Sequence, residues 1–137
     1  MKVLFIAGFA AITPDASGSA ALYRDALGLP LEGDGYLSTE HVDGVKHLGV
    51  WPLDEAARSI FGATSWPDDV PVPQATIEFE VDDVAAAASE LEQHDLVLLH
   101  GARTEPWGQT VARLLSPEGL VVGLTNTPWL REDAGGG

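Results

Sequence analysis

The order of predicted secondary structure repeats within this chain, and the repeat constrains the fold more than any other feature of the sequence. Each half reads as a strand, a helix and three short strands, judged from apolar alternation, helix caps and turn residues. An internal repeat of this size indicates two modules that complete one another's core. We expect a first module at residues 1–52, a linker with a short helix at 53–74, a second module at 75–130 and a disordered tail at 131–137.

The ends of the predicted helices mark the same point in each module. Asp15 or Ser17 can cap the first helix, which Gly28 ends, and Asp82 or Asp83 can cap the second. The opening stretch "MKVLFIAGFAAI" also has the length of a secretory signal. We interpret it as a buried strand, because "ATIEFEV" occupies the equivalent position in the second module.

The composition limits the kinds of molecule that the protein is expected to bind. The 137 residues contain 21 acidic and 7 basic side chains, for a net charge of −14, and they contain no cysteine. Nucleic acid is excluded as an expected partner because its binding needs a cationic surface. No stretch approaches the ~20 apolar residues of a membrane span. The absence of cysteine excludes disulfides and thiolate chemistry, and it suits the reducing cytoplasm, where we expect the protein to act.

A hairpin in the first module brings an acid and a histidine together. Asp43-Gly44 is a strong two-residue turn signal, and the register it sets places Glu40 opposite His47. Alternation gives one shared strand face, which holds Tyr36, Ser38, Glu40, His47, Gly49 and Trp51. The Glu40–His47 pair can serve as two metal ligands, as a general acid and base, or as an ordinary polar contact. No third metal ligand is visible beside it.

Three segments carry a resemblance to a known family. They are "LYRDALGL" at the end of the first helix, "IEFEVDDV" at the start of the second module, and "EPWGQTVARLLSPEGLVVGL" near the end. The chain resembles the vicinal oxygen chelate superfamily of glyoxalases, bleomycin-resistance proteins and extradiol dioxygenases. The resemblance implies an α+β fold in which paired βαβββ modules form a curved mixed sheet around a cleft. It also implies a homodimer, with the modules paired either within one chain or by exchange.

Metal-dependent members of this superfamily bind a divalent ion through His or Glu of the first and last strands of each module. Carried over by position, the first-strand ligands fall on Gly8 and Thr76, and the last-strand ligands fall on Gly123 and on Leu48 or Gly49. One threonine hydroxyl among glycine and apolar positions cannot coordinate a hard divalent ion. We therefore expect neither a metal nor another cofactor.

The second module is expected to contribute acids to the same cleft. Alternation sends Thr76, Glu78 and Glu80 toward the cleft, although a strand glutamate can equally face solvent. The candidate ligand-binding residues are Tyr36, Ser38, Glu40, His47, Trp51, Thr76, Glu78, Glu80, Trp107 and Gly123. Aromatic faces combined with carboxylates suit a cationic, partly planar small molecule.

The sequence therefore predicts a metal-free small-molecule-binding protein of the glyoxalase/bleomycin-resistance type. Its expected ligand is a cationic or aromatic compound such as an antibiotic, which the protein would sequester. The alternative is an enzyme of the same fold, acting as a lyase, isomerase or dioxygenase. Such an enzyme would use Glu40 and His47 as a metal-free acid and base, or a metal ion held by displaced ligands.

Overall fold

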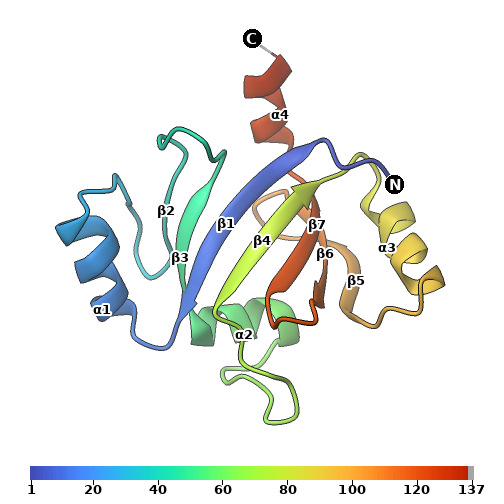
Figure 1. Cartoon of the computed structure of the whole chain (residues 1–137), viewed down its shortest axis with the longest axis horizontal. Helices are drawn as coiled ribbons and strands as arrows, with labels where there is room; N and C mark the ends of the chain where they lie inside the picture. The colour runs from blue at the N-terminus through green and yellow to red at the C-terminus, as the bar shows by residue number, and fades with distance from the viewer. Residues whose placement is uncertain (136–137) are drawn as a thin grey trace.

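Seven strands form one open mixed sheet in the order β2-β3-β1-β4-β7-β6-β5 (Figure 1). The computed structural model describes the backbone of residues 1–135 and the side-chain surroundings of residues 1–131. The strands are β1 (Phe5–Thr13), β2 (Leu37–Thr39), β3 (Leu48–Pro52), β4 (Ala75–Glu80), β5 (Leu98–Thr104), β6 (Thr110–Leu115) and β7 (Val121–Asn126). The helices are α1 (Ala16–Ala20), its π-helical continuation η1 (Ala21–Ala26), α2 (Leu53–Phe61), α3 (Val84–Gln93) and α4 (Pro128–Gly135).

The two halves of the chain meet at the centre of this sheet. β1 and β4, the first strand of each half, pair antiparallel, with Gly8 opposite Glu78 and Ala10 opposite Thr76. Each of them pairs on its other edge with the last strand of its own half, β1 with β3 and β4 with β7, and both pairs are parallel. The expected α+β fold with two similar halves is confirmed, and the halves pair here within one chain.

The first half departs from the expected repeat because it has two strands after its helix. The missing strand is reduced to an isolated bridge between Glu32 and Ser38. Gly33 and Gly35, with φ of 141° and 84°, turn the chain immediately after this bridge. Positive φ is incompatible with an extended ladder, so a strand cannot continue through this segment.

The register of the first hairpin agrees with the sequence prediction. Leu37 pairs with Val50 and Ser38 with Gly49, the same register that places Glu40 opposite His47. The regular ladder is shorter than predicted, because β2 ends at Thr39 and β3 begins at Leu48. The turn between them is closed by the Val45 amide, which donates to the Val42 carbonyl at 3.4 Å.

Aspartate caps begin both long helical segments, as the sequence indicates. The Asp15 carboxylate accepts from the Gly18 amide at 3.0 Å, and Asp83 accepts from the Ala86 amide at 3.0 Å. Gly28, with φ of 72°, lies two residues after η1 in the left-handed conformation expected of a helix stop. The caps fix where each helix leaves its preceding strand.

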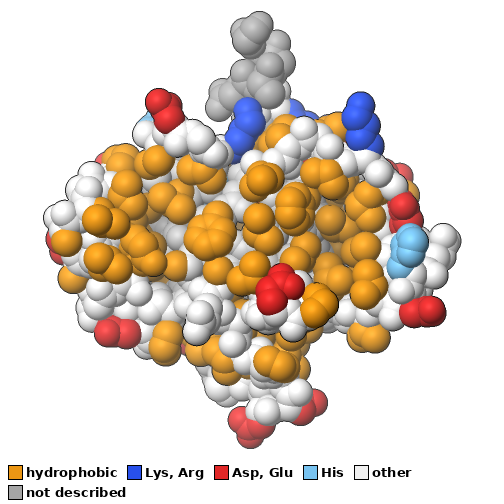
Figure 2. Space-filling view, in the orientation of Figure 1, with side chains coloured by type: hydrophobic (Ala, Val, Ile, Leu, Met, Phe, Trp, Pro, Cys, Tyr) orange, Lys and Arg blue, Asp and Glu red, His pale blue; other side chains and the backbone are white. Residues whose placement is uncertain are grey.

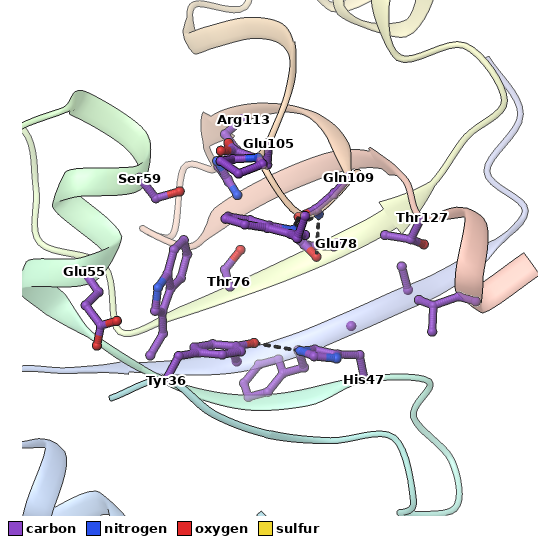
Figure 3. A pocket seen from close by; sticks show the side chains of 18 of the residues that line it. Tyr36, His47, Glu55, Ser59, Thr76, Glu78, Glu105, Gln109, Arg113 and Thr127 are labelled. Atoms are coloured by element: carbon purple, nitrogen blue, oxygen red, sulfur yellow. Dashed lines mark hydrogen bonds and ion pairs between the residues drawn. The ribbon is translucent and has the colours of Figure 1, made fainter. Parts of the chain in front are cut away.

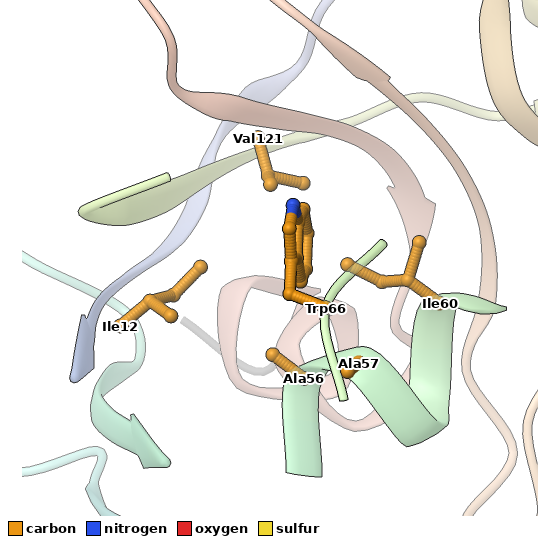
Figure 4. Close-up of a cluster of buried hydrophobic side chains, with 6 residues drawn as sticks. All are labelled: Ile12, Ala56, Ala57, Ile60, Trp66 and Val121. Atoms are coloured by element: carbon orange, nitrogen blue, oxygen red, sulfur yellow. The ribbon is translucent and has the colours of Figure 1, made fainter. Parts of the chain in front are cut away.

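The helices cover the two faces of the sheet unequally. α1 and α3 pack separately on one face, against two clusters that include Val50 for α1 and Leu124 for α3. α2 packs at one end of the opposite face, where its Ala56, Ala57 and Ile60 meet Ile12, Trp66 and Val121 (Figure 4). The Trp66 indole N–H donates to the Val70 and Pro71 carbonyls, each at 3.0 Å, which ties the linker to this cluster.

A buried carboxylate holds the start of α4 against the sheet. Glu80 is fully buried, accepts from the amide and hydroxyl of Thr127, and forms an ion pair with Arg131 at 2.7 Å. The predicted tail at 131–137 therefore begins inside α4, and residues 136–137 lie outside the described part of the chain. Among the described helices, none combines the length and apolar character required to traverse a bilayer.

The surface seen in Figure 2 is apolar over much of its centre, and most of its charged side chains lie near the edge. The exposed large hydrophobic residues of the molecule include Ile6 and Phe9 of β1, at 52% and 40% exposure. None of the described helices covers these side chains, because α1 and α3 pack on separate parts of the sheet.

Candidate ligand-binding site

One cavity of about 630 Å³ lies on the face of the sheet that carries α2, and both halves of the chain line it (Figure 3). The first half contributes the aromatic side chains of Tyr36, His47 and Trp51, and the second contributes charged and amide side chains together with two tryptophans. Helix α2 closes one end, and Trp129 and Leu130 of α4 lie at the other. A volume of this size is typical of sites for drug-sized molecules, which span roughly 300–1,000 Å³.

The aromatic wall is a packed set of three rings. The Tyr36 and His47 rings lie nearly parallel, 8° apart, with centroids 5.9 Å apart, and the Trp51 ring meets Tyr36 edge-on at 6.1 Å. The Tyr36 hydroxyl lies 2.7 Å from His47 Nε2 (Figure 3). Burial, and secondarily the nearby Glu78 charge, raises the pKa of Tyr36, so the phenol keeps its proton and can donate.

Two glycines of the first half leave the space that these rings occupy. A Cβ atom at Gly49 would overlap the hydroxyl and ring of Tyr36, so the tyrosine lies directly on the strand backbone. A Cβ atom at Gly8 would stand 3.1 Å from the His47 carbonyl oxygen. Both glycines therefore serve close packing of the aromatic wall.

The charged wall is organised around Glu78 of β4. Gln109 donates its side-chain amide to both Glu78 oxygens, at 3.3 and 3.2 Å, and to the Thr125 hydroxyl at 2.8 Å. The Trp107 indole N–H donates in turn to Gln109 Oε1 at 2.9 Å. This chain fixes the amide orientation of Gln109 and holds the Glu78 carboxylate beside the exposed ring of Trp107.

Arg113 of β6 places a guanidinium group inside the same cavity. Its side chain is only 2% exposed, and its Nη1 lies 3.5 Å from Glu105 Oε1. Its Cζ atom stands 5.6 Å from the centre of the Trp51 ring, within the range of a cation–π contact. Burial lowers the pKa of Arg113, although the group stays charged because an arginine pKa begins so high.

His100 of β5 is held neutral beside this arginine. Its Nδ1 lies 2.8 Å from the Gly101 carbonyl and its Nε2 lies 3.1 Å from Arg113 Nη1. A carbonyl can only accept and a guanidinium can only donate, so Nδ1 carries the proton and Nε2 accepts. Burial, with the charges of Arg113 and Arg103, lowers the pKa of His100.

The structure brings together six of the ten predicted binding residues. The six that line the cavity are Tyr36, His47, Trp51, Thr76, Glu78 and Trp107. Gly123 lies beneath this wall, where a Cβ atom would stand 3.1 Å from Glu78 Cγ. Ser38 pairs with Gly49 on β2 and does not line the cavity.

The remaining two predicted residues lie at the edge of the site. Glu40 stands behind the aromatic wall, with one carboxylate oxygen 3.9 Å from His47 Nδ1. The two catalytic candidates, Glu40 and His47, are therefore neighbours, and only His47 reaches the cavity. Glu80 lies on the same face of β4 as Glu78, but its carboxylate is used by Thr127 and Arg131.

Sequence reasoning missed Arg113 and Gln109. The signal was present in the second hairpin, whose register pairs Arg113 directly with Gly123. Because cross-strand partners share one face, placing Gly123 on the cleft side also places Arg113 there. Gln109 lies two residues before Val111 and four before Arg113, and alternation places all three on the same face of the strand.

The positions that carry metal ligands in metal-dependent relatives do not fit an ion here. Gly8, Gly49 and Gly123 offer no donor atoms and have neighbouring side chains packed against them, which leaves the Thr76 hydroxyl. Within the described residues, no group of three or more His, Asp or Glu side chains is arranged to hold a metal ion. One side-chain hydroxyl is too few donors to hold a divalent ion at these positions.

Comparison with known proteins identifies the class. The family model of the Glyoxalase/Bleomycin resistance protein/Dioxygenase superfamily matches residues 6–124. The chain therefore belongs to this superfamily. No curated protein sequence matches it.

Solved structures share the fold at low sequence identity. A glyoxalase/bleomycin resistance protein/dioxygenase superfamily member from Vibrio splendidus 12B01 is 14% identical, with a TM-score of 0.56 over 90% of this chain and 98% of that one. Streptomyces coelicolor methylmalonyl-CoA epimerase, with 2-nitronate-propionyl-CoA bound, is 16% identical, with a TM-score of 0.56 over 93% and 96%. A Legionella pneumophila protein described as an NAD-dependent benzaldehyde dehydrogenase is 12% identical, with a TM-score of 0.58 over 87% and 96%. At these identities the similarity concerns the fold alone.

Proposed function

We propose that this protein binds a planar aromatic compound carrying a positive charge, such as an antibiotic, and sequesters it without a metal ion. The observation behind the proposal is the Glu78 carboxylate at the cavity wall. Among the described residues, no basic nitrogen lies within 4.0 Å of it, and its hydrogen-bond partner is the neutral Gln109 amide. The Arg113 charge acts on Glu78 from farther away, and a cationic ligand would give the carboxylate a direct ion pair.

The rings around Glu78 favour an aromatic ligand. Trp51 and Tyr36 stand on one wall, and Trp107 stands on the other with 55% of its surface exposed. Flat rings on both sides of a cavity allow a planar molecule to stack, and a positive charge on that molecule adds cation–π attraction. Exposure of Trp107 leaves it free to be covered when the ligand binds.

Tryptophan fluorescence provides the test. Aminomethylanthracene, a planar cation, is expected to quench the emission of the wild-type protein, and anthracenecarboxylate should bind more weakly. Glu78→Gln keeps the shape of the side chain and removes its charge, so the cationic probe should bind at least about tenfold more weakly, as for other desolvated charge pairs. Glu118→Gln, at an exposed turn outside the cavity, is the matched control. Equal affinity in wild type and Glu78→Gln would refute the proposal.

A second candidate function is metal-free acid–base catalysis. It is favoured by one observation: Tyr36, His47 and Glu40 form a chain, with 2.7 Å between the hydroxyl and Nε2 and 3.9 Å between Nδ1 and the carboxylate. Such a chain can move a proton at the cavity wall. Recovery of the bound compound separates the two functions, because a binding protein returns it unchanged. If an enzyme converts it, Tyr36→Phe should lower kcat more than it raises KM.

The homodimer and the cytoplasmic location stay predictions. A second copy of the chain would cover the exposed side chains of Ile6 and Phe9 on β1. Sedimentation velocity at several concentrations, compared between wild type and Phe9→Lys, tests the dimer, and cell fractionation tests the location.

A further inference from the structure

Three buried polar atoms of the described side chains have no hydrogen-bond partner, and all three belong to residues that line the same cavity. They are Ser59 Oγ of α2, Thr76 Oγ1 of β4 and Arg113 Nε of β6. A buried polar group without a partner is destabilising and is rare in folded proteins. Three such groups in one cavity, from three separate elements, indicate that a bound molecule completes them.

Ser59 belongs to α2, which closes one end of the cavity, and Thr76 and Arg113 line the same cavity. Figure 3 shows the Ser59 hydroxyl extending from α2 into the cavity and the Thr76 hydroxyl turned away from β4 toward the side where Arg113 lies. Thr76 and Arg113 are 4% and 2% exposed, so bulk water does not reach them freely. All three groups can donate a hydrogen bond, and the guanidinium can only donate.

Arg113 shares its nearest carboxylate with a second guanidinium group. Its ion-pair partner, Glu105, is shared with Arg103, whose Nε lies 3.1 Å from the same carboxylate oxygen. His100 accepts from Arg113 Nη1 as a neutral ring and contributes no negative charge. One carboxylate therefore serves two guanidinium groups at short range, and the Glu78 charge acts on Arg113 from farther away. An oxyanion at this point would give Arg113 a contact that it does not share.

We infer that the cavity contains a second polar subsite, formed by Arg113, Thr76 and Ser59, which binds a carboxylate or another oxyanion of the ligand. The inference rests on the proposed function and narrows it to an amphoteric aromatic compound. The positive group of that compound pairs with Glu78, and its oxyanion accepts from Arg113 Nε and the two hydroxyls.

The spacing of the two subsites follows from the strand that carries both. Thr76 and Glu78 are two residues apart on one face of β4, a separation of about 7 Å along a strand. A ligand that spans both subsites therefore carries its opposite charges across roughly one ring system. An anthracene with an aminomethyl group and a carboxylate at opposite positions of its central ring meets this requirement.

The experiment compares three anthracene probes that differ only in charge: the aminomethyl cation, the carboxylate anion and the amphoteric compound with both groups. Wild-type protein should bind the amphoteric probe about tenfold or more tightly than the cationic one, because hydrogen bonds to charged groups are stronger than those between neutral groups. Arg113→Met should reverse this preference, since it removes the donor and also a like charge that opposes the cation. Thr76→Val, which keeps the side-chain shape, should weaken the amphoteric probe by about threefold to tenfold.

Matched controls use the same substitutions outside the cavity. Thr104→Val removes a hydroxyl that bonds to Thr110 on the exposed edge of β5, and Arg24→Met removes an exposed guanidinium paired with Asp25. Both should leave the preference for the amphoteric probe unchanged. Thermal melting checks that each variant folds, and Thr76→Val keeps the test decisive if Arg113→Met does not fold.

The outcomes separate the inference from the proposed function. Binding of the cationic probe with Glu78 dependence, but with no preference for the amphoteric probe and no effect of Thr76→Val or Arg113→Met, overturns the oxyanion subsite alone. That result would mean that water satisfies the three atoms. Binding of the anionic probe with Arg113 dependence, without binding of the cation, supports the subsite and refutes the role of Glu78. Binding of none of the probes refutes both.

Discussion

The two halves of the chain use one backbone arrangement to build two different walls. In the first half, Ala10 of β1 pairs with Gly49 of β3, and in the second half Glu78 of β4 pairs with Gly123 of β7 at the equivalent place. Beside Gly49 the small alanine leaves room that Tyr36 fills with its ring. Beside Gly123 the room is filled by Glu78 itself. The side chain that covers the last-strand glycine therefore decides whether a wall is aromatic or charged.

The same contrast extends to the ends of the first strands. Ile12 of β1 packs against α2 in a hydrophobic cluster, whereas Glu80, at the equivalent position of β4, holds α4 through hydrogen bonds and an ion pair. One half attaches its helix by apolar burial and the other by a buried charge. The predictions that follow test these differences in order of decreasing effect.

Glu80→Ala should have the largest effect on folding. It removes a fully buried carboxylate that accepts three hydrogen bonds, and it leaves the Thr127 amide and hydroxyl and the Arg131 Nε without that acceptor. We expect the free energy of unfolding to fall by about 3 kcal/mol, in the range for broken buried ion pairs. Urea denaturation measures the change, with Glu92→Ala, at an exposed position of α3, as a control that should stay within about 0.5 kcal/mol. A similar small loss for both variants would mean that α4 is held by other contacts.

The paired glycines should differ in their tolerance of a methyl group. Gly49→Ala places Cβ on the hydroxyl and ring of Tyr36 and should destabilise the protein by about 1–3 kcal/mol, as overpacking does. Gly123→Ala meets the flexible Glu78 side chain at 3.1 Å, which can shift, so its cost should be clearly smaller. Denaturation curves of both variants, with near-ultraviolet circular dichroism to follow the Tyr36–Trp51 contact, test this contrast. Equal losses would show that the two glycines are equivalent.

Tyr36→Phe should have a modest effect on stability. It keeps the ring that packs on His47 and Trp51 and removes the hydroxyl that bonds to His47 Nε2. The expected loss is about 1 kcal/mol, the usual net value of one hydrogen bond. Thermal melting measures it. A gain in stability would show that the hydroxyl is poorly accommodated in the aromatic wall.

Acidification should produce the smallest and most gradual effect, through His100. Its pKa is lowered in the folded protein, so the unfolded chain takes up the proton more readily. The contribution of His100 to stability is therefore complete above its ordinary pKa of 6.5 and is lost as pH falls through the lower folded value. Melting temperatures across this range should decline less steeply in His100→Gln. The same decline in both proteins would show that other titrating groups cause the pH dependence of stability.

The sequence predicted the elements of the fold well where local signals were strong. The Asp43-Gly44 turn gave the register that places Ser38 opposite Gly49, and aspartates gave the helix starts. It failed at the strand that follows the first helix, because Gly33 and Gly35 turn the chain there, and only tertiary pairing decides whether such a short segment is a strand.

The sequence predicted mainly those site residues whose position follows from strand alternation. Alternation found Tyr36, Trp51 and Glu78, because strand faces follow directly from register. Arg113 was missed because a basic residue in a strand is usually expected to face solvent. Its ion-pair partner Glu105 comes from the loop before β6, and strand alternation does not reveal that contact. Alternation also placed Glu80 toward the cleft, but it could not reveal that α4 would occupy its carboxylate.

The antiparallel pair of β1 and β4 joins the two halves, and the cavity extends across that pair. A molecule that contacts both walls therefore adds a second connection between two halves that backbone hydrogen bonds already join. Its binding energy adds to the stability of the joined form by RT ln(1 + [L]/Kd). The amides of β1 and β4 should accordingly gain the most protection from hydrogen exchange when the cavity is filled, which makes this strand pair a reporter of occupancy for any compound.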